Sequence, residues 1–253
     1  MIPKIIHYCW LSGDPIPENL QRCMDSWKVR LPDYEFVLWN FGRFDKESSQ
    51  WVSQAFDSKK YAFAADYIRL YAVYHYGGIY LDMDIEALRS FDDLLDADVM
   101  LAYENDERSG IEAGCFGAEK ENPFIGACLD YYEGRSFIKA DGSFDTLPLP
   151  KIMMRISEKY PLLDIRDRLT FTCKSYQTGK IDTNEHSYAI HHFAGSWTSH
   201  AQKTYDRQRM FLTSHFGVVG KLIAIFPFCL WQIRDNGVRC FVKKLRTRIH
   251  RNP

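Results

Sequence analysis

The sequence predicts an α/β protein with a parallel sheet, and two observations carry this prediction. An apolar segment, a helical segment and a second apolar segment follow one another near the start of the chain, as in a βαβ unit. Residues 62–86, AFAADYIRLYAVYHYGGIYLDMDIE, then combine a helical pattern, a double glycine and a short apolar strand that ends at two aspartates. Ligands of open α/β sheets bind beyond the carboxyl ends of the strands. We therefore expect the functional site at the end of this strand.

The first elements follow from the amino-terminal pattern. Residues 4–9 are an apolar run that predicts a buried strand, and residues 34–39 predict a second strand. Neither G-x-G-x-x-G nor G-K-S/T occurs in the chain, which excludes a dinucleotide fingerprint and a P-loop. Between the two strands a helix is expected from about residue 17, because its apolar side chains fall on one stripe: Leu20, Cys23, Met24 and Trp27.

Residues 62–76 predict a helix that is buried on one face. Asp66 and Arg69 are three residues apart on this helix, so they can pair with each other or both face a ligand. The double glycine ends the helix, and residues 79–81 are a short inner strand. The apolar residues that recur at the helical spacing of three and four are Phe63, Tyr67, Leu70, Tyr71 and Tyr74.

Asp82 and Asp84 are candidate ligands for a hard divalent ion. Mg²⁺ or Mn²⁺ binds one or two carboxylates and completes its coordination with water and with phosphate oxygens of a substrate. Because the chain has no glycine-rich phosphate loop, such an ion would also neutralise a bound diphosphate. An isolated D-x-D often marks only a turn, but its combination with the preceding helix and strand favours a metal site.

The rest of the chain continues with strands and helices. A polar loop, residues 104–110, separates the first two of these strands. No role is assigned to Glu104 or Glu112, because acids in a polar loop are more often solvated than functional. Strands are expected at residues 99–103, 115–118, 169–173 and 187–193, and helices at residues 123–133 and 149–160.

Residues 64–84, AADYIRLYAVYHYGGIYLDMD, resemble the DXD sugar-transfer region of glycosyltransferase family 32. This GT-A-type family is similar to capsular-polysaccharide and initiating mannosyl transferases, and distantly similar to the clostridial glucosylating toxins. The likeness includes IPKIIHYCW at residues 2–10 and HHFAGSW at residues 191–197. It implies a GT-A-like, Rossmann-type fold with a mixed, mainly parallel sheet flanked by helices. It also implies Mn²⁺ or Mg²⁺ as cofactor and retaining transfer from a nucleotide-diphosphate sugar.

The resemblance assigns the nucleotide contacts to the first strand and to the strand before the D-x-D. Trp10 would stack on the base, with His7 and Tyr8 nearby, and Tyr80 would lie against the nucleotide. For Trp10 the alternative is that its ring only packs at the end of the strand.

The resemblance also assigns the catalytic groups. Asp66 and Arg69 would bind hydroxyls of the donor sugar, and Arg69 would add positive charge near the diphosphate. Asp84 would bind the ion directly, whereas Asp82 would also reach the ribose or act through water. These groups would neutralise the charge of the departing diphosphate.

The heptapeptide HHFAGSW would complete the site. Neighbouring residues of a strand point to opposite faces, so only one of His191 and His192 can reach the two aspartates. The matching position is His192, which we expect to be the third metal ligand, with His191 as the alternative. Ser196 and Trp197 resemble a mobile loop that contacts the diphosphate and the glycosidic oxygen and closes over the donor.

The expected function is transfer of a hexose, from a UDP-hexose or from GDP-mannose as the rival donor, to a glycan or lipid-linked glycan in surface polysaccharide synthesis. Two other functions stay open. A phosphatase of the haloacid-dehalogenase type also uses D-x-D after a strand, but its motif is normally near the amino terminus and is followed by Gly-Thr. A non-catalytic sugar-binding assembly protein would keep the fold and lose the ion.

The expected domain, residues 1–216, is followed by an apolar and basic segment, residues 217–253. Residues 222–231 are apolar but too few to span a bilayer, which takes about 20 residues. Residues 234–251 contain seven Lys or Arg and one acid, which suits a helical appendage on an anionic membrane surface. No DNA- or RNA-reading motif accompanies this charge, so nucleic acid is not expected as a partner.

The expected location is the cytoplasm, at the inner face of a bacterial plasma membrane. Seven cysteines without a C-x-x-C pair favour a reducing compartment. The first residues also lack the basic and apolar pattern of a secretory leader.

Overall fold

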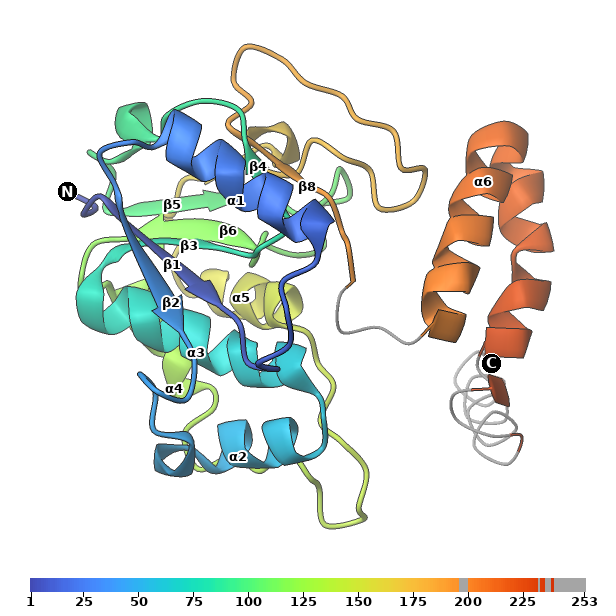
Figure 1. Cartoon of the computed structure of the whole chain (residues 1–253), viewed down its shortest axis with the longest axis horizontal. Coiled ribbons are helices and arrows are strands. Elements are labelled where there is room, and N and C mark those ends of the chain that lie inside the picture. The colour runs from blue at the N-terminus through green and yellow to red at the C-terminus, as the bar shows by residue number, and fades with distance from the viewer. Residues whose placement is uncertain (196–199, 232, 235–237, 239–253) are drawn as a thin grey trace. The chain divides into compact units, whose positions relative to one another are not determined.

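The computed structural model describes residues 1–195, 200–231, 233, 234 and 238 (Figure 1). Contacts between residues divide the chain into two units. The first comprises residues 1–174 and 181–194, and the second comprises residues 175–180 and the described part of residues 195–253.

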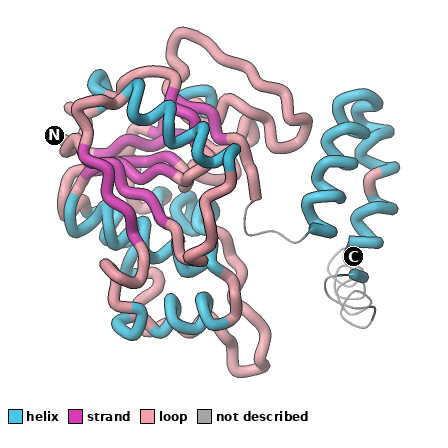
Figure 2. Tube along the Cα trace, viewed as in Figure 1, coloured by secondary structure: helices cyan, strands magenta, loops and turns pink. Residues whose placement is uncertain are grey.

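The first unit is built on a six-stranded mixed sheet (Figures 1 and 2). In spatial order the strands are β2 (Glu35–Trp39), β1 (Ile5–Cys9), β3 (Gly78–Leu81), β6 (Cys115–Ala118), β5 (Val99–Ala102) and β7 (Ile165–Arg166). β1 is parallel to both β2 and β3, and β5 is parallel to β7, whereas β6 runs antiparallel to its two neighbours. The predicted α/β class with a mixed, mainly parallel sheet is therefore confirmed.

Helices cover both faces of this sheet, and each face has its own apolar core. On one side the core includes Trp51, Ile68 and Phe124, and on the other side it includes Leu20 and Trp27. The first side carries α2 (Gln50–Asp57), α3 (Tyr61–Tyr76), α4 (Pro123–Asp130) and α5 (Leu149–Ser157), and the second side carries α1 (Glu18–Arg30).

A two-stranded ribbon lies against α1. It pairs β4 (Ile85–Ala87) antiparallel with β8 (Ala189–His191). The indole Nε1 of Trp27 donates a hydrogen bond of 2.7 Å to the carbonyl of Ile85. The backbone N–H of Ala87 donates one of 2.9 Å to the Ser26 hydroxyl. The first helix therefore fixes the strand that follows the two aspartates.

The double glycine between α3 and β3 has a steric cause. Gly77 and Gly78 have φ values of 67° and 103°, which favour glycine. A Cβ on Gly78 would lie 2.7 Å from the carbonyl oxygen of Ile5, and a Cβ on Gly77 would lie 2.9 Å from Pro3. Only glycine lets the chain turn out of α3 and place β3 directly beside β1.

Two segments differ from the predicted strands. Residues 169–173 are not a strand, because the backbone N–H groups of Thr170, Phe171 and Thr172 bond to carbonyls three or four residues earlier. They form part of a 3-10 helix, Arg168–Thr170, and the turn that follows it. The strand predicted at residues 187–193 is shorter, since only Ala189–His191 pairs with β4. The strands β4 and β7 were not predicted.

The second unit is a helical hairpin. Helix α6 (His200–Ile223) contains a non-helical residue, Gly217, with φ 52° and ψ −124°. Beyond it the chain doubles back, and the ring of Trp231 stacks on Tyr205 at 5.2 Å. The predicted boundary at residue 217 falls on this kink, whereas the chain passes between the two units at residues 174–175, 180–181 and 194–195. Among the described residues, none of the helices has the length and apolar character needed to cross a bilayer.

Candidate metal and donor site

The two aspartates stand in a tight turn between β3 and β4. The backbone N–H of Asp82 donates to the carbonyl of Gly114 (2.7 Å), which continues the pairing of β3 with the neighbouring chain. The N–H of Ile85 then donates to the carbonyl of Asp82 (2.9 Å), so the chain bends at once. In a straight strand, side chains two residues apart are separated by a full repeat. The bend lets the carboxylates of Asp82 and Asp84 approach the same point.

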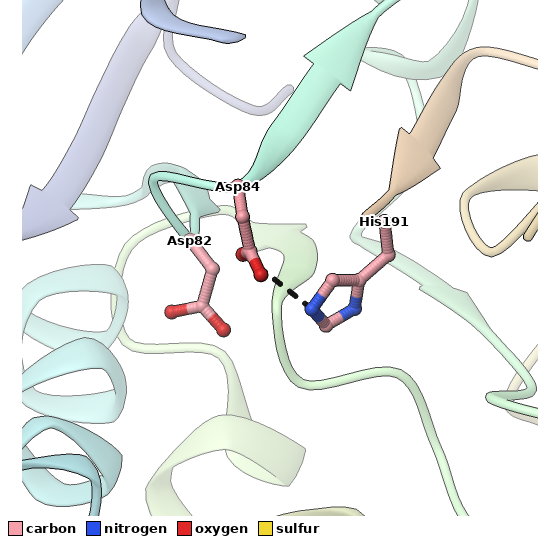
Figure 3. A group of neighbouring side chains, drawn as sticks. All are labelled: Asp82, Asp84 and His191. Atoms are coloured by element: carbon pink, nitrogen blue, oxygen red, sulfur yellow. Dashed lines mark ion pairs between the residues drawn. The ribbon is translucent and has the colours of Figure 1, made fainter. Parts of the chain in front are cut away.

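His191 completes a group of three potential metal ligands (Figure 3). It lies at the end of β8, opposite Ile85 in the ribbon. One ligand atom each from Asp82, Asp84 and His191 lies within 4.8 Å of the other two, and Nε2 of His191 is 3.5 Å from Oδ1 of Asp84. Two carboxylates and an imidazole are suitable ligands for Mn²⁺ and acceptable for Mg²⁺.

His192 does not join this group, and the prediction that it lies with the two aspartates is wrong. Its Nε2 lies 2.7 Å from a carboxylate oxygen of Glu86. Glu86 is opposite Ile190 in the ribbon, and Ile190 and His192 share a face because side chains of a strand alternate. The neighbouring position, His191, therefore faces the aspartates.

Glu112 lies behind His191 and was missed by the sequence reasoning. Nδ1 of His191 is 3.2 Å from both carboxylate oxygens of Glu112. Burial alone would lower the pKa of His191, but Glu112, with a smaller contribution from Asp84, raises this pKa to about 10. Burial would conversely raise the pKa of Glu112, but His191 and three hydrogen bonds lower it to about 2. The two groups form a buried, charge-assisted pair.

Arg69 lies on the other side of Asp82. Its Nη1 donates to the carbonyl of Ala113 (2.7 Å) and to Oδ2 of Asp82 (3.3 Å), and its Nη2 is 3.4 Å from Asp66. Burial raises the pKa of Asp66 to about 6, although the charge of Arg69 opposes this shift. Burial also raises the pKa of Asp82. The structure thus brings Asp66 and Arg69 of α3 together with Asp82, and their predicted contacts with donor-sugar hydroxyls stay predictions.

Steric and electrostatic features of the cluster fit a divalent cation. A Cβ on Gly114 would lie 2.9 Å from side-chain atoms of Asp82, Glu112 and His191, so only glycine leaves these groups their space. Acids also outnumber bases, which is the electrostatic condition for binding Mg²⁺ or Mn²⁺. The acids are Asp66, Asp82, Asp84 and Glu112, and the cationic groups are Arg69, Lys174 and His191.

Residues 17–101 match the family described as "Glycosyltransferase sugar-binding region containing DXD motif". The chain contains a DXD glycosyltransferase region. The aspartates of the motif are Asp82 and Asp84, and the resemblance expected from residues 64–84 is confirmed.

The DXD region is also shared with curated proteins. Inositol phosphoceramide mannosyltransferase 3 of Schizosaccharomyces pombe is 36% identical over 128 residues, which cover 49% of this chain and 35% of that protein. Mannosyl phosphorylinositol ceramide synthase SUR1 of Saccharomyces cerevisiae is 34% identical over 133 residues, which cover 49% of this chain and 33% of that protein. The chain thus spans 33% to 35% of the length of these two relatives.

Solved glycosyltransferase structures are similar at a lower level. PaToxG Glycosyltransferase has 19% sequence identity and a TM-score of 0.46, covering 63% of this chain and 70% of that one. The apo form of GlyE from Streptococcus pneumoniae TIGR4 has 12% identity and a TM-score of 0.35, covering 66% and 45%. Because these identities and TM-scores are low, the fold class is assigned from the sheet described above and not from the similarity to these structures.

Two residues predicted to contact the nucleotide are instead buried supports of the DXD region. Tyr80 donates from its hydroxyl to Oδ1 of Asp82 (2.9 Å), and its ring lies 4.6 Å from the guanidinium carbon of Arg69. His7 accepts a hydrogen bond from Trp39 at Nδ1 (3.1 Å), while its Nε2 lies 2.8 Å from the carbonyl of Gly77. Both side chains are only 1% exposed, so neither prediction of a nucleotide contact holds.

The remaining predicted donor contacts stay predictions. Tyr8 and Trp10 are both partly exposed, and the indole of Trp10 donates to the carbonyl of Asp14 (2.7 Å). Ser196 and Trp197 lie outside the described residues. The residue shortly before them, Ala194, is held at the DXD motif, because its backbone N–H donates to Oδ2 of Asp84 (2.7 Å).

Proposed function

We propose that the protein is a metal-dependent, retaining glycosyltransferase that moves a hexose from a nucleotide-diphosphate sugar to a glycan or lipid-linked glycan acceptor. The observation that carries this proposal is the placement of a ring nitrogen of His191 within 4.8 Å of a carboxylate oxygen of each aspartate of the DXD motif. The late histidine comes from far along the chain, beyond the matched region of residues 17–101. A non-catalytic protein that had lost the ion would not need this third ligand.

Each residue of the site has a role in the proposed reaction. Asp82, Asp84 and His191 would hold Mn²⁺ or Mg²⁺, which supplies positive charge to a departing diphosphate. Arg69 donates to Oδ2 of Asp82 and its charge opposes the rise of the Asp82 pKa on burial, and Tyr80 fixes the other oxygen. We propose retention of the sugar's anomeric configuration because the resemblance to glycosyltransferase family 32 implies it. No carboxylate is assigned as a nucleophile.

The names of the relatives support a mannosyl donor and a glycolipid acceptor. Both relatives described above are named for mannosyl transfer or for mannosyl phosphorylinositol ceramide synthesis. This favours GDP-mannose, the rival donor in the sequence-based expectation, beside the UDP-hexoses. We also propose an acceptor in bacterial surface polysaccharide synthesis, which the names of these relatives do not support.

A donor panel tests the proposal and separates it from its two rivals. Purified protein is incubated with UDP-hexoses and GDP-mannose, with Mn²⁺ or with EDTA, and donor consumption is measured. We expect Mn²⁺-dependent hydrolysis or transfer that is lost in Asp84→Asn and kept in the matched control Glu86→Gln. Phosphate release from monoesters without donor consumption would support the phosphatase, and silence toward every donor would support the binding protein.

We also propose that the second unit binds an anionic membrane at the cytoplasmic face of a bacterial plasma membrane. Large apolar side chains are exposed along the hairpin, among them Phe216 (55%), Val218 (75%) and Phe226 (71%). The sequence beyond it, residues 234–251, contains seven Lys or Arg and one acid. Apolar side chains beside clustered basic charge suit a helix lying on an anionic lipid surface.

Vesicle sedimentation tests this second proposal. We expect the protein to sediment with phosphatidylglycerol vesicles and to remain in solution with phosphatidylcholine vesicles. The double variant Val218→Asp/Phe226→Asp should lose this binding, whereas Val29→Asp, at a 70% exposed position of α1, should keep it. Equal behaviour of both variants would exclude the hairpin as the lipid contact, and concentration-dependent dimers that need Val218 would assign it to a second copy.

A further inference from the structure

We propose that Glu112 is a positioning residue that holds His191 with one defined ring nitrogen facing the aspartates. The inference depends on the proposed metal site, but it concerns a residue outside the matched region of residues 17–101. Glu112 belongs to neither the DXD motif nor the HHFAGSW motif, and it is adjacent to neither in the sequence. Only the fold brings it to the site.

The carboxylate of Glu112 is itself held in place. The backbone N–H of Gly114 donates to Oε1 (2.6 Å), and the hydroxyl of Thr172 donates to Oε2. The backbone of Glu112 is anchored as well, since its N–H donates to the carbonyl of Ala102 at 2.9 Å. Glu112 is only 3% exposed, so water does not compete for these bonds. Both carboxylate oxygens also lie 3.2 Å from Nδ1 of His191, from which they can accept a further hydrogen bond.

This arrangement determines which nitrogen of His191 is available. A hydrogen bond from Nδ1–H to a carboxylate keeps a proton on that nitrogen, and Nε2, which releases its own proton when a cation binds, is then the atom that can bind the cation. Nε2 is the atom that lies 3.5 Å from Asp84. The ring plane is held too, because Phe193 stacks on the imidazole at 4.2 Å. His191 is thereby presented in one orientation before any ligand arrives.

Gly114 connects this support to the DXD motif. Its N–H donates to Glu112 (2.6 Å), and its carbonyl accepts from the backbone N–H of Asp82 (2.7 Å). One residue thus ties the carboxylate that orients His191 to the first aspartate. Both bonds use backbone groups of Gly114, so this residue holds the Glu112 carboxylate and the backbone of Asp82 at a fixed spacing.

A purely structural role for Glu112 makes a different prediction. If the pair with His191 served stability alone, removing the charge of Glu112 would lower thermal stability and leave the affinity of the folded protein for Mn²⁺ unchanged. If Glu112 orients His191, Mn²⁺ affinity must fall even in the folded protein. The loss must also disappear when His191 is already absent.

Mn²⁺ binding to the full chain therefore tests the inference. The dissociation constant is measured by electron paramagnetic resonance of free Mn²⁺, first with Mn²⁺ alone and then with UDP or GDP present. We expect Glu112→Gln to weaken binding about 10- to 100-fold. The matched control Glu86→Gln removes the corresponding carboxylate beside His192 and should change binding less than about twofold. In a His191→Ala background, Glu112→Gln should cause no further loss.

The outcomes separate this inference from the proposed function. Mn²⁺ binding that depends on Asp84 but not on Glu112 would overturn the inference and leave the metal site standing. Binding that does not depend on Asp84 would overturn both. If Glu112→Gln does not fold, Thr172→Val decides, because it keeps the carboxylate and removes one hydrogen bond from it. We then expect a loss of about threefold or more, together with a shift of the His191 imidazole ¹⁵N signals. Unchanged affinity and unchanged signals would overturn the inference.

Discussion

His191 and His192 are neighbours, and each lies beside a carboxylate, but the two pairs differ in burial. The side chains of His191 and Glu112 are 13% and 4% exposed, whereas those of His192 and Glu86 are 31% and 41% exposed. The closer contact is in the exposed pair, at 2.7 Å against 3.2 Å. Distance alone would therefore select the wrong histidine. Burial, and the further hydrogen bonds that hold Glu112, distinguish a supported ligand from a surface ion pair.

The largest effect expected from this difference concerns a second buried pair, Arg69 with Asp66 and Asp82. Arg69→Ala leaves the buried carboxylate of Asp66 and the partly buried carboxylate of Asp82 without their cation, which should lower the free energy of unfolding by about 3–5 kcal/mol. Arg89, which pairs with Asp93 at the surface, is the control, and Arg89→Ala should cost less than about 1 kcal/mol. Urea unfolding measures both. Equal losses would show that burial does not separate the two classes of pair.

A third histidine sharpens the comparison, because His7 is buried without any carboxylate. Burial, which outweighs the hydrogen bond to Gly77, lowers the pKa of His7 from 6.5 to about 4. Between these two values the unfolded chain binds a proton that the folded protein does not bind. Stability should therefore fall as the pH falls from about 6.5 to 4, by about 3 kcal/mol from this group.

The variant His7→Gln isolates this contribution. Glutamine can still accept from Trp39 and donate to the carbonyl of Gly77, but it does not titrate. Urea unfolding at pH 7 and at pH 4.5 should show a smaller loss of stability in the variant than in the parent protein. The same loss in both proteins would mean that His7 is not held neutral by burial.

Catalysis separates the two neighbouring histidines directly. His191→Ala should lower the rate of Mn²⁺-dependent donor consumption about 100-fold or more, because it removes a group that holds the charge-neutralising ion. His192→Ala should change the rate less than about twofold. Rates at saturating donor and Mn²⁺, measured beside thermal unfolding of each variant, decide this. A larger effect of His192→Ala would restore the original assignment from the sequence.

The smallest effect is expected in the exposed pair. Glu86→Gln should change the free energy of unfolding by less than about 1 kcal/mol. Water solvates the two separated groups of an exposed pair almost as well as they stabilise each other. The difference between variant and parent should shrink further in 1 M salt, where the screening length is about 3 Å. Urea titrations at low and high salt give this comparison. A loss above about 2 kcal/mol would require a structural role for Glu86 that the contacts do not explain.

Much of the fold could be predicted because its signals are local. The apolar runs of β1 and β2, the stripe of α1 and the sequence from α3 through the double glycine into β3 each lie within one short segment. The D-x-D at the end of β3 is local in the same sense. Its meaning as a site followed from the general position of ligands at strand ends.

The supports of the site could not be predicted, because they depend on contacts between distant segments. Whether His191 or His192 faces the aspartates is decided by the register of β8 on β4, and Ile85 and His191 are 106 residues apart in the numbering. Glu112 and Thr172 come from segments without a recognisable motif. Tyr80 and His7 show the opposite error, since polar aromatic residues near a predicted site were assigned to the ligand although they are buried against the protein itself.

The cluster of ligands draws on two separate sheets. Asp82 ends a strand of the six-stranded sheet, whereas Asp84 and His191 belong to the turn and the strand of the two-stranded ribbon. A cation bound by all three would act as a cross-link between these sheets. Occupancy by Mn²⁺ should then restrain the ribbon, raise the melting temperature in proportion to the logarithm of ion concentration above the dissociation constant, and slow amide exchange in β8 more than in β1.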